Sequence, residues 1–202
     1  MKPALLFLTA SLILAAPLIL TAPLSAQTTV RYWPGAHPKA ELAQWAMELW
    51  AAASGGTMKV EKVKTAEEAD IRFMWIDPQR KGLYGQAQTF REGGREVAEV
   101  VINPSIASLG PEMVAATAKD PLYGDVILFL TCVHESGHAL GLPHTRQYAD
   151  IMYSFEFGGD FVEYFGRYRR KLRTRTDMRK AALLSPGDAA EIKARALART
   201  RK

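Results

Sequence analysis

The sequence predicts an α+β fold, in which one strand and one helix are followed by several strands, a buried helix, a long basic insertion and a final helix. Three observations favour this class. Residues 38–53 have apolar side chains at helical spacing, residues 126–133 are apolar on nearly every side, and short strand-like runs lie between them. No internal repeat or low-complexity linker interrupts this order, so we expect a single domain.

The first predicted helix covers residues 38–53. Leu42, Trp45 and Leu49 recur three or four positions apart, so they share one face of that helix. The sequence SGG follows at residues 54–56, and glycine after the last periodic residue is a common end of a helix. We therefore expect a long helix that packs one face against the rest of the domain.

Two further helices are indicated nearer the C-terminus. The run VILFLTCV at residues 126–133 has the all-round apolar character of a helix buried under a sheet, and Asp125 is placed to cap it. The last helix covers residues 185–197, because Ser185 and Asp188 occupy the positions of a capping box at its start.

One segment, HESGHALGLPH, contains three of the four histidines of the chain. His134 and His138 are four residues apart, about one turn of a helix, so both imidazoles can point at one metal ion. Gly141 can adopt a backbone conformation that other residues rarely take, which would let the chain turn back and bring His144 to the same ion. The spacing therefore predicts three histidine ligands, with Glu135 beside them.

The chemistry of these residues indicates a catalytic zinc ion. Three histidines leave a fourth tetrahedral position open for water, whereas structural zinc sites are closed by four protein ligands. Zinc lowers the pKa of its water toward neutrality, and Glu135 is placed to take the proton as that water attacks a carbonyl group. The same carboxyl group would then pass the proton to the leaving amine. The expected reaction is hydrolysis of a peptide bond, with one zinc ion as cofactor.

Two other interpretations of the motif are weaker. The first is that the histidines are ordinary packing or surface residues that match HExxH by chance. HExxH alone is only moderately specific, but here five positions are fixed within eleven residues, which disfavours a chance match. A closed structural zinc site would need a fourth strong ligand, and the candidate, Cys132, is two residues from His134 and points to another side of the helix. We expect Cys132 to be a buried core residue, as free cysteines usually are.

The extended pattern HExxHxxGxxH is followed by ADIMYS, and together they resemble the signature of the metzincin metallopeptidases. The resemblance implies a twisted mixed β-sheet packed on a long first helix and an active-site helix, with a C-terminal helix. It implies that the three histidines of the motif bind the zinc ion and that Glu135 is the general base. It also implies that Met152 lies beneath the metal as a packing residue and does not bind it.

Within the metzincins the chain is similar to the matrixin group, because the likeness continues outside the zinc motif in the expected order. Four segments resemble that group's first strand, third strand, edge strand and the strand paired with the edge, at residues 31–33, 69–77, 82–90 and 97–105. In that family a substrate peptide lies extended along the edge strand, by β-augmentation.

The chain also departs from the matrixins of animals. Only His37 lies outside the motif, so we expect no second zinc ion. A calcium ion stays possible but unsupported, because the glycine-rich loop at residues 91–96 lacks a dense carboxylate cluster. The first strand begins soon after residue 26, so we expect neither a propeptide nor an inhibitory cysteine.

A further departure is a long basic insertion at residues 155–184. In the family this region walls the pocket for the residue after the scissile bond, and Tyr164, Phe165 and Tyr168 are candidates for that wall. Within it, residues 167–180 read RYRRKLRTRTDMRK, which could bind an anionic polymer or a membrane surface. A solvated helix or loop is the plainer interpretation, and the run has too few suitably spaced aromatics for specific nucleic-acid binding.

The net charge of +5 conceals an asymmetry along the chain. Residues 167–202 contain thirteen Lys or Arg and three Asp or Glu, a local charge of +10, which leaves −5 for residues 1–166. The positive charge is therefore a local feature of the C-terminal part and not a property of the predicted catalytic body.

Residues 1–26 have the pattern of a secretory signal peptide, with Lys2, an apolar run and then small residues. A membrane anchor is the alternative, but Pro17, Pro23 and the small residues that follow favour cleavage. Cleavage would leave residues 27–202 as a single catalytic domain, which we expect to be secreted or periplasmic and monomeric. Since the chain has one cysteine, it can form no internal disulfide.

The sequence thus predicts a secreted zinc-dependent endopeptidase that acts on protein or peptide substrates. Two other functions stay open: a zinc-holding binding protein without proteolytic activity, and a zinc hydrolase of a non-protein amide in the cell envelope. Glu135 disfavours the first, because a purely structural zinc site needs no carboxylate there. The metal site does not distinguish the second, because the carbonyl chemistry is the same.

Overall fold

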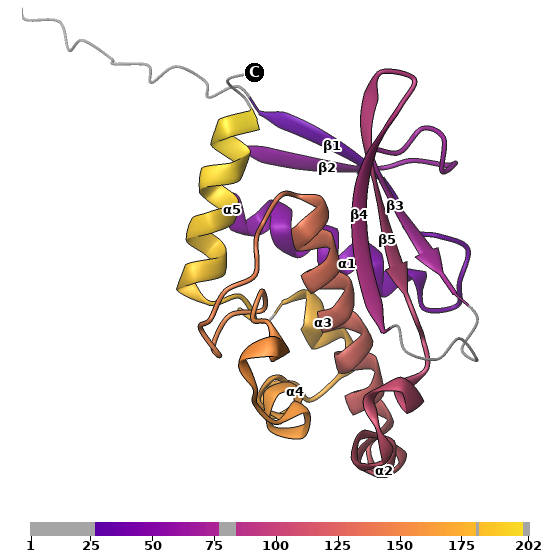
Figure 1. Cartoon of the computed structure of the whole chain (residues 1–202), viewed down its shortest axis with the longest axis vertical. Helices are drawn as coiled ribbons and strands as arrows, with labels where there is room; N and C mark the ends of the chain where they lie inside the picture. Colours follow the sequence, from indigo (N-terminus) through magenta and orange to yellow (C-terminus); the bar gives the residue numbers. More distant parts are fainter. Residues whose placement is uncertain (1–26, 77–83, 181, 200–202) are drawn as a thin grey trace, which may run out of the picture.

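The computed structural model describes residues 27–76, 84–180 and 182–199. Within them the strands form one mixed sheet in the order β2-β1-β3-β5-β4 (Figure 1). The strands are β1 Thr28–Trp33, β2 Met58–Lys62, β3 Ile71–Trp75, β4 Gly85–Glu92 and β5 Arg95–Ile102. β1 pairs in parallel with β2 and β3, and β3 with β5, whereas β4 runs antiparallel to β5. Of the predicted edge strand, residues 84–90 are described, and β4 does lie at the edge of the sheet.

The helices are α1 Ala40–Ala53, α2 Pro111–Lys119, α3 Pro121–Ala139, α4 Phe161–Arg169 and α5 Pro186–Arg199. α1 and α3 pack against each other and against the sheet, while α2 and α4 lie together at the lower end of α3 (Figure 1). This is the predicted α+β architecture, with a mixed sheet packed on a long first helix and on the helix of the histidine motif. None of the helices in the described residues combines the length and apolar character that a membrane crossing requires.

The hydrophobic core lies between the sheet and the two long helices. Alternate side chains of the strands are buried against it, such as Ile71 and Phe73 on β3 and Val100 and Ile102 on β5. Trp50 of α1 is fully buried, and its indole N–H donates to the carbonyl of residue 133 in α3 at 3.0 Å. Each such side chain contributes about 1.5–3 kcal/mol through burial, so the two helices are held firmly under the sheet.

The start of α3 differs from the prediction. Asp125 is not its cap, because the helix begins at Pro121, where proline is favoured in the first turn. Asp125 instead lies inside the helix, and its carboxylate pairs with Lys39 at 2.8 Å and with Arg175 at 2.7 Å. These partners are far away in the sequence, so a local pattern could not reveal them.

The basic insertion is folded onto the body of the protein. It contains α4 and two short 3-10 helices, Phe155–Phe157 and Arg175–Arg179. Four of its arginines form ion pairs with acidic side chains of α1, α3 and α4 and with the residue before α3. The pairs are Arg169–Asp120, Arg170–Glu163, Arg175–Asp125 and Arg179–Glu48. This arrangement favours a structural role for the insertion, and its binding to an anionic polymer stays a prediction.

Candidate metal centre

Three imidazoles converge beside the C-terminal end of α3. The helix presents His134 and His138 one turn apart, and the chain turns at Gly141, whose φ of +93° favours glycine, before it returns with His144. The Nε2 atom of His144 lies 3.2 Å from that of His134 and 3.0 Å from that of His138. In the described residues this is the only group of three or more His, Cys, Asp or Glu side chains close enough to share an ion.

The spacing of the nitrogens fits a tetrahedral metal ion. With Zn–N bonds of about 2.05 Å, two tetrahedral ligand nitrogens lie about 3.3 Å apart. The His134 Nδ1–H donates to the Ile151 carbonyl at 2.7 Å, and the His138 Nδ1–H donates to the Leu142 carbonyl at 2.8 Å. Because a carbonyl can only accept, these bonds place the proton on Nδ1 and leave the Nε2 lone pairs free to face inward.

Burial also favours the neutral form of His134 and His138, which is the form that binds a metal ion. Burial lowers the pKa of His134 to about 4, and it lowers the pKa of His138 as well. The donor set, its spacing and its protonation all fit zinc, and we find no feature of the three side chains that disagrees with such an ion.

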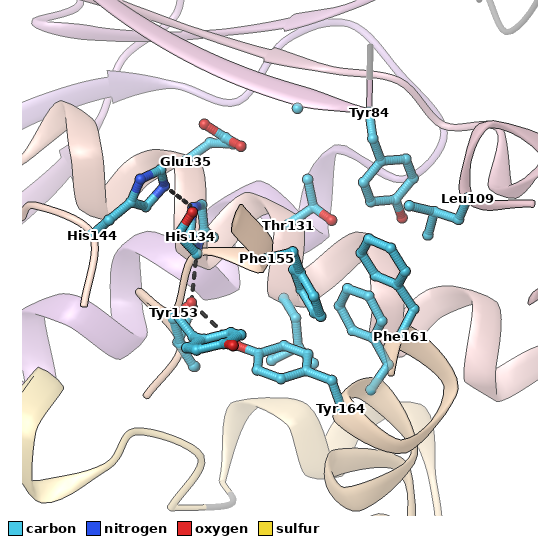
Figure 2. Close-up of a pocket in the computed structure, with 15 residues that line it drawn as sticks. Tyr84, Leu109, Thr131, His134, Glu135, His144, Tyr153, Phe155, Phe161 and Tyr164 are labelled. Carbon is cyan, nitrogen blue, oxygen red and sulfur yellow. Dashed lines mark hydrogen bonds between the residues drawn. The ribbon is translucent and has the colours of Figure 1, made fainter. Parts of the chain in front are cut away.

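Glu135 lies next to these histidines and under the start of β4 (Figure 2). Its side chain is buried, and this burial raises its pKa to about 7. The close approach of the strand depends on Gly85, because a Cβ atom there would lie 2.7 Å from Glu135 Oε1 and 2.7 Å from Thr131 Cγ2. Glu135 is therefore confined between helix and strand, with a pKa suited to taking up and giving back a proton near neutrality.

The methionine turn packs against α3, the helix that carries His134 and His138. Met152 is buried, and Gly137 of α3 makes room for it, since a Cβ atom at residue 137 would lie 2.5 Å from Met152 Sδ. The Asp188 carboxylate holds the turn in place by accepting from the backbone N–H groups of Ile151 at 2.8 Å and Met152 at 3.3 Å. The helix that carries His134 and His138 thus packs on a turn that is fixed to α5.

Asp188 also completes the predicted capping box. Its carboxylate accepts from the Ser185 N–H at 3.1 Å, and its own N–H donates to the Ser185 hydroxyl at 3.0 Å. That hydroxyl in turn donates to Asp150 at 2.6 Å, which carries the network into the methionine turn. One buried set of polar groups therefore fixes both the start of α5 and the floor of the site.

A cavity of about 290 Å³ opens beside Glu135, His134 and His144 (Figure 2). Its walls are mostly apolar, and six aromatic side chains contribute to them: Tyr84, Tyr153, Phe155, Phe161, Tyr164 and Phe165. Several of these rings contact one another, as Phe155 does with Phe161 at a centroid distance of 4.1 Å and with Tyr164 at 4.9 Å. The wall is a packed aromatic cluster supplied largely by the insertion.

The structure brings most of the sequence-predicted residues together. Of the three candidate wall residues, Tyr164 and Phe165 line the cavity, whereas Tyr168 is buried outside its lining. Cys132 is fully buried, as predicted. His37 lies apart from the histidine group and stacks on Trp75.

Sequence reasoning missed three residues of the site. Tyr84 and Gly85 come from the edge strand, and Gly137 lies within the motif as one of its variable positions. Glycine is otherwise disfavoured inside helices and strands, so its presence at residues 85 and 137 was the available signal of close packing. No comparable signal marked Tyr84.

Comparison with known proteins agrees with the motif and its surroundings. The family model described as Matrixin matches residues 34–158, more than half of the chain, including the whole histidine motif and the methionine turn. Among solved structures, archaemetzincin from Methanopyrus kandleri matches at 17% identity with a TM-score of 0.43, covering 87% of this chain and 98% of that one. No curated protein matches the chain. The predicted resemblance is confirmed, and the chain belongs to the matrixin family of zinc metallopeptidases.

Proposed function

We propose that this protein is an exported endopeptidase in which His134, His138 and His144 hold one zinc ion and Glu135 is the general base. The observation that carries the proposal is the convergence of three Nε2 atoms, where that of His144 lies 3.2 Å from His134 and 3.0 Å from His138. Glu135 lies beside them in the lining of an apolar cavity. A peptidase site needs a group of metal-binding side chains and space for a substrate. The three histidines are the candidates for the first, and the cavity beside Glu135 is the candidate for the second.

When bound there, zinc would supply a Lewis acid for the substrate carbonyl and lower the pKa of the attacking water. The Glu135 carboxylate would take a proton from that water as its oxygen bonds to the carbonyl carbon. It would then give the proton to the amide nitrogen as the C–N bond breaks, so that the products are a carboxylic acid and an amine, which ionise to a carboxylate and an ammonium group. Confinement by Gly85 would keep the carboxylate close to the reacting atoms throughout.

The substrate we propose is an extended peptide. β4 pairs with β5 on one side only, so the backbone groups on its other side are available for a peptide strand. The aromatic cavity lies directly below the start of this strand and would accept a large apolar side chain of the residue after the scissile bond. A cavity of about 290 Å³ beside Glu135, His134 and His144 also argues against a blocked cleft, and so against a protein that only holds zinc.

Export of the protein remains part of the proposal. The signal peptide predicted at residues 1–26 lies outside the described residues, so its support is the sequence pattern alone. A catalytic domain at residues 27–202, a monomeric state and a secreted or periplasmic location are proposed on the same basis.

The test is cleavage of a denatured, fluorescently quenched protein by the purified protein, beside Glu135→Gln, with zinc measured in both. We expect wild type to cleave and the variant to lose activity at least about 1,000-fold while it retains its zinc, because only the proton transfer is removed. Zinc without cleavage in wild type would contradict the endopeptidase and favour a binding protein or an enzyme for an envelope amide. Full activity in the variant would contradict the role of Glu135.

A further inference from the structure

The inner end of the aromatic cavity contains a polar group without a partner. In the described residues, the Tyr84 hydroxyl oxygen is the single buried side-chain nitrogen or oxygen that makes no hydrogen bond. Leaving a buried hydroxyl unpaired is unfavourable, and nearly all buried polar groups in folded proteins have a partner. An exception at the wall of a substrate cavity therefore needs an explanation.

The polar side chain nearest to the Tyr84 hydroxyl is Thr131. It lies close enough to lower the pKa of Tyr84 by a weak hydrogen-bond interaction, but the contact falls short of a hydrogen bond of normal geometry, and the Thr131 hydroxyl donates instead to the Ile127 carbonyl at 2.9 Å. Burial raises the pKa of Tyr84, so the hydroxyl stays protonated and can both donate and accept.

The position of the Tyr84 ring is set by the sheet. Its backbone carbonyl accepts from the Asn103 N–H at 2.9 Å, directly before β4 begins. From there the ring extends into the cavity and its hydroxyl points toward Leu109, on the side away from the histidines (Figure 2). The hydroxyl thus lies where the tip of a long side chain would arrive after it passes Glu135.

The walls at this end can yield to such a side chain. Leu109 ends a four-residue 3-10 helix and is only partly buried, and Phe161 is the first residue of α4 and 38% exposed. The opposite wall, formed by α3, is firmly packed. A ring that enters from the metal side can therefore reach the Tyr84 hydroxyl by displacing Leu109 or Phe161, without any change in α3.

We infer that Tyr84 is a specificity-determining residue, and that its hydroxyl bonds to the phenolic hydroxyl of a substrate tyrosine placed directly after the scissile bond. Aromatic walls favour a ring in the cavity, and the unpaired hydroxyl at its end favours a ring with a polar tip. This inference rests on the proposed function and narrows it to peptides with tyrosine at that position.

The experiment compares three peptides that differ only in the residue after the scissile bond: tyrosine, phenylalanine or 4-methylphenylalanine, which has the shape of tyrosine without its hydroxyl. We expect wild type to cleave the tyrosine peptide about five- to tenfold faster, in kcat/KM, than the methyl analogue, as one net hydrogen bond implies. Tyr84→Phe should reduce that ratio to about one. Tyr153→Phe is the matched control, because Tyr153 lines the same cavity but already donates to the Gly158 carbonyl at 2.9 Å, so the ratio should persist.

A second measurement does not depend on catalysis. Tyr84→Phe removes an unpaired hydroxyl, so the unliganded variant should melt a few degrees above wild type. Equal ratios in wild type and Tyr84→Phe, or a wild-type preference for the methyl analogue, would overturn the inference while leaving the peptidase intact. If Tyr84→Phe fails to fold, the inference is decided by wild type alone, through its ratio of kcat/KM for the tyrosine peptide to kcat/KM for the methyl analogue. If wild type cleaves neither these peptides nor a denatured protein, the proposed function itself is contradicted, and the inference with it.

Discussion

Replacing Gly85 by alanine tests whether the confinement of Glu135 matters for catalysis. The new Cβ atom would lie 2.7 Å from Glu135 Oε1, 2.7 Å from Thr131 Cγ2 and 2.9 Å from Glu135 Cγ. The two closest contacts are about 0.7 Å shorter than the 3.4 Å at which ordinary van der Waals contact begins. Since Gly85 has no positive φ, alanine fits its backbone conformation, and only the side-chain contacts must change.

Either the Glu135 side chain or β4 must move to relieve this overlap. A displacement approaching 1 Å at a reacting group costs about 100-fold in rate, so we expect kcat/KM of Gly85→Ala to fall by about that factor. Zinc content should not change, because the three atoms nearest to the new Cβ belong to Glu135 and Thr131 and not to a histidine. The assay is steady-state cleavage of a quenched peptide, with zinc content and melting temperature measured on the same samples.

The matched control is Gly124→Ala, since its Cβ atom would meet nothing closer than Thr117 at 4.0 Å. That variant lies in α3, where alanine is the better helix former, so it should keep full activity and gain up to about 1 kcal/mol of stability. A Gly85→Ala protein that cleaves within about twofold of wild type would refute the reasoning. So would a loss of activity that is explained entirely by lost zinc.

The other predictions concern stability. Gly137→Ala should destabilise the protein by about 1–3 kcal/mol, because its Cβ atom would lie 2.5 Å from Met152 Sδ and 3.1 Å from Trp50. Urea denaturation measures this loss, and unchanged stability would contradict the close packing at residue 137. Asp188→Asn should lower the free energy of unfolding by about 1–3 kcal/mol, because an amide has one acceptor oxygen whereas the carboxylate accepts from three backbone N–H groups. An unchanged free energy of unfolding would show that these hydrogen bonds are dispensable. Burial raises the pKa of Glu135 from 4.5 to about 7, so ionisation of this carboxyl group destabilises the folded state. Glutamine cannot ionise, and above pH 7 metal-free Glu135→Gln should therefore be more stable than metal-free wild type by on the order of 3 kcal/mol. That gap should close as the pH falls well below 4.5, where Glu135 is protonated in both the folded and the unfolded protein; a gap that does not vary with pH would contradict the assignment.

The histidine motif shows why part of this site could be predicted from the sequence. Its geometry is local: helical spacing alone puts His134 and His138 on one face, and a glycine turn returns His144 within six residues. The capping box of Ser185 and Asp188 is local in the same sense, and it too is present. The edge strand followed from its resemblance to a family with a known order of strands.

The rest depends on contacts between distant segments. Asp125 looked like a helix cap, but it pairs with Lys39 and Arg175, which are 86 and 50 positions away. The Tyr84 ring belongs to the cavity only because the sheet places the start of β4 over α3. β2 and α2 were not predicted individually, since a short polar strand and a nine-residue helix carry weak periodic signals.

The central claim is that zinc held by the three histidines enables cleavage through Glu135. The most direct test removes the metal with a chelator and returns zinc in steps, while cleavage of a quenched peptide and bound zinc are followed together. We expect activity to rise in proportion to bound zinc and to reach its maximum at one ion per chain, whereas Glu135→Gln should bind the same amount and stay inactive. Full cleavage by the metal-free protein, or by zinc-loaded Glu135→Gln, would contradict the account.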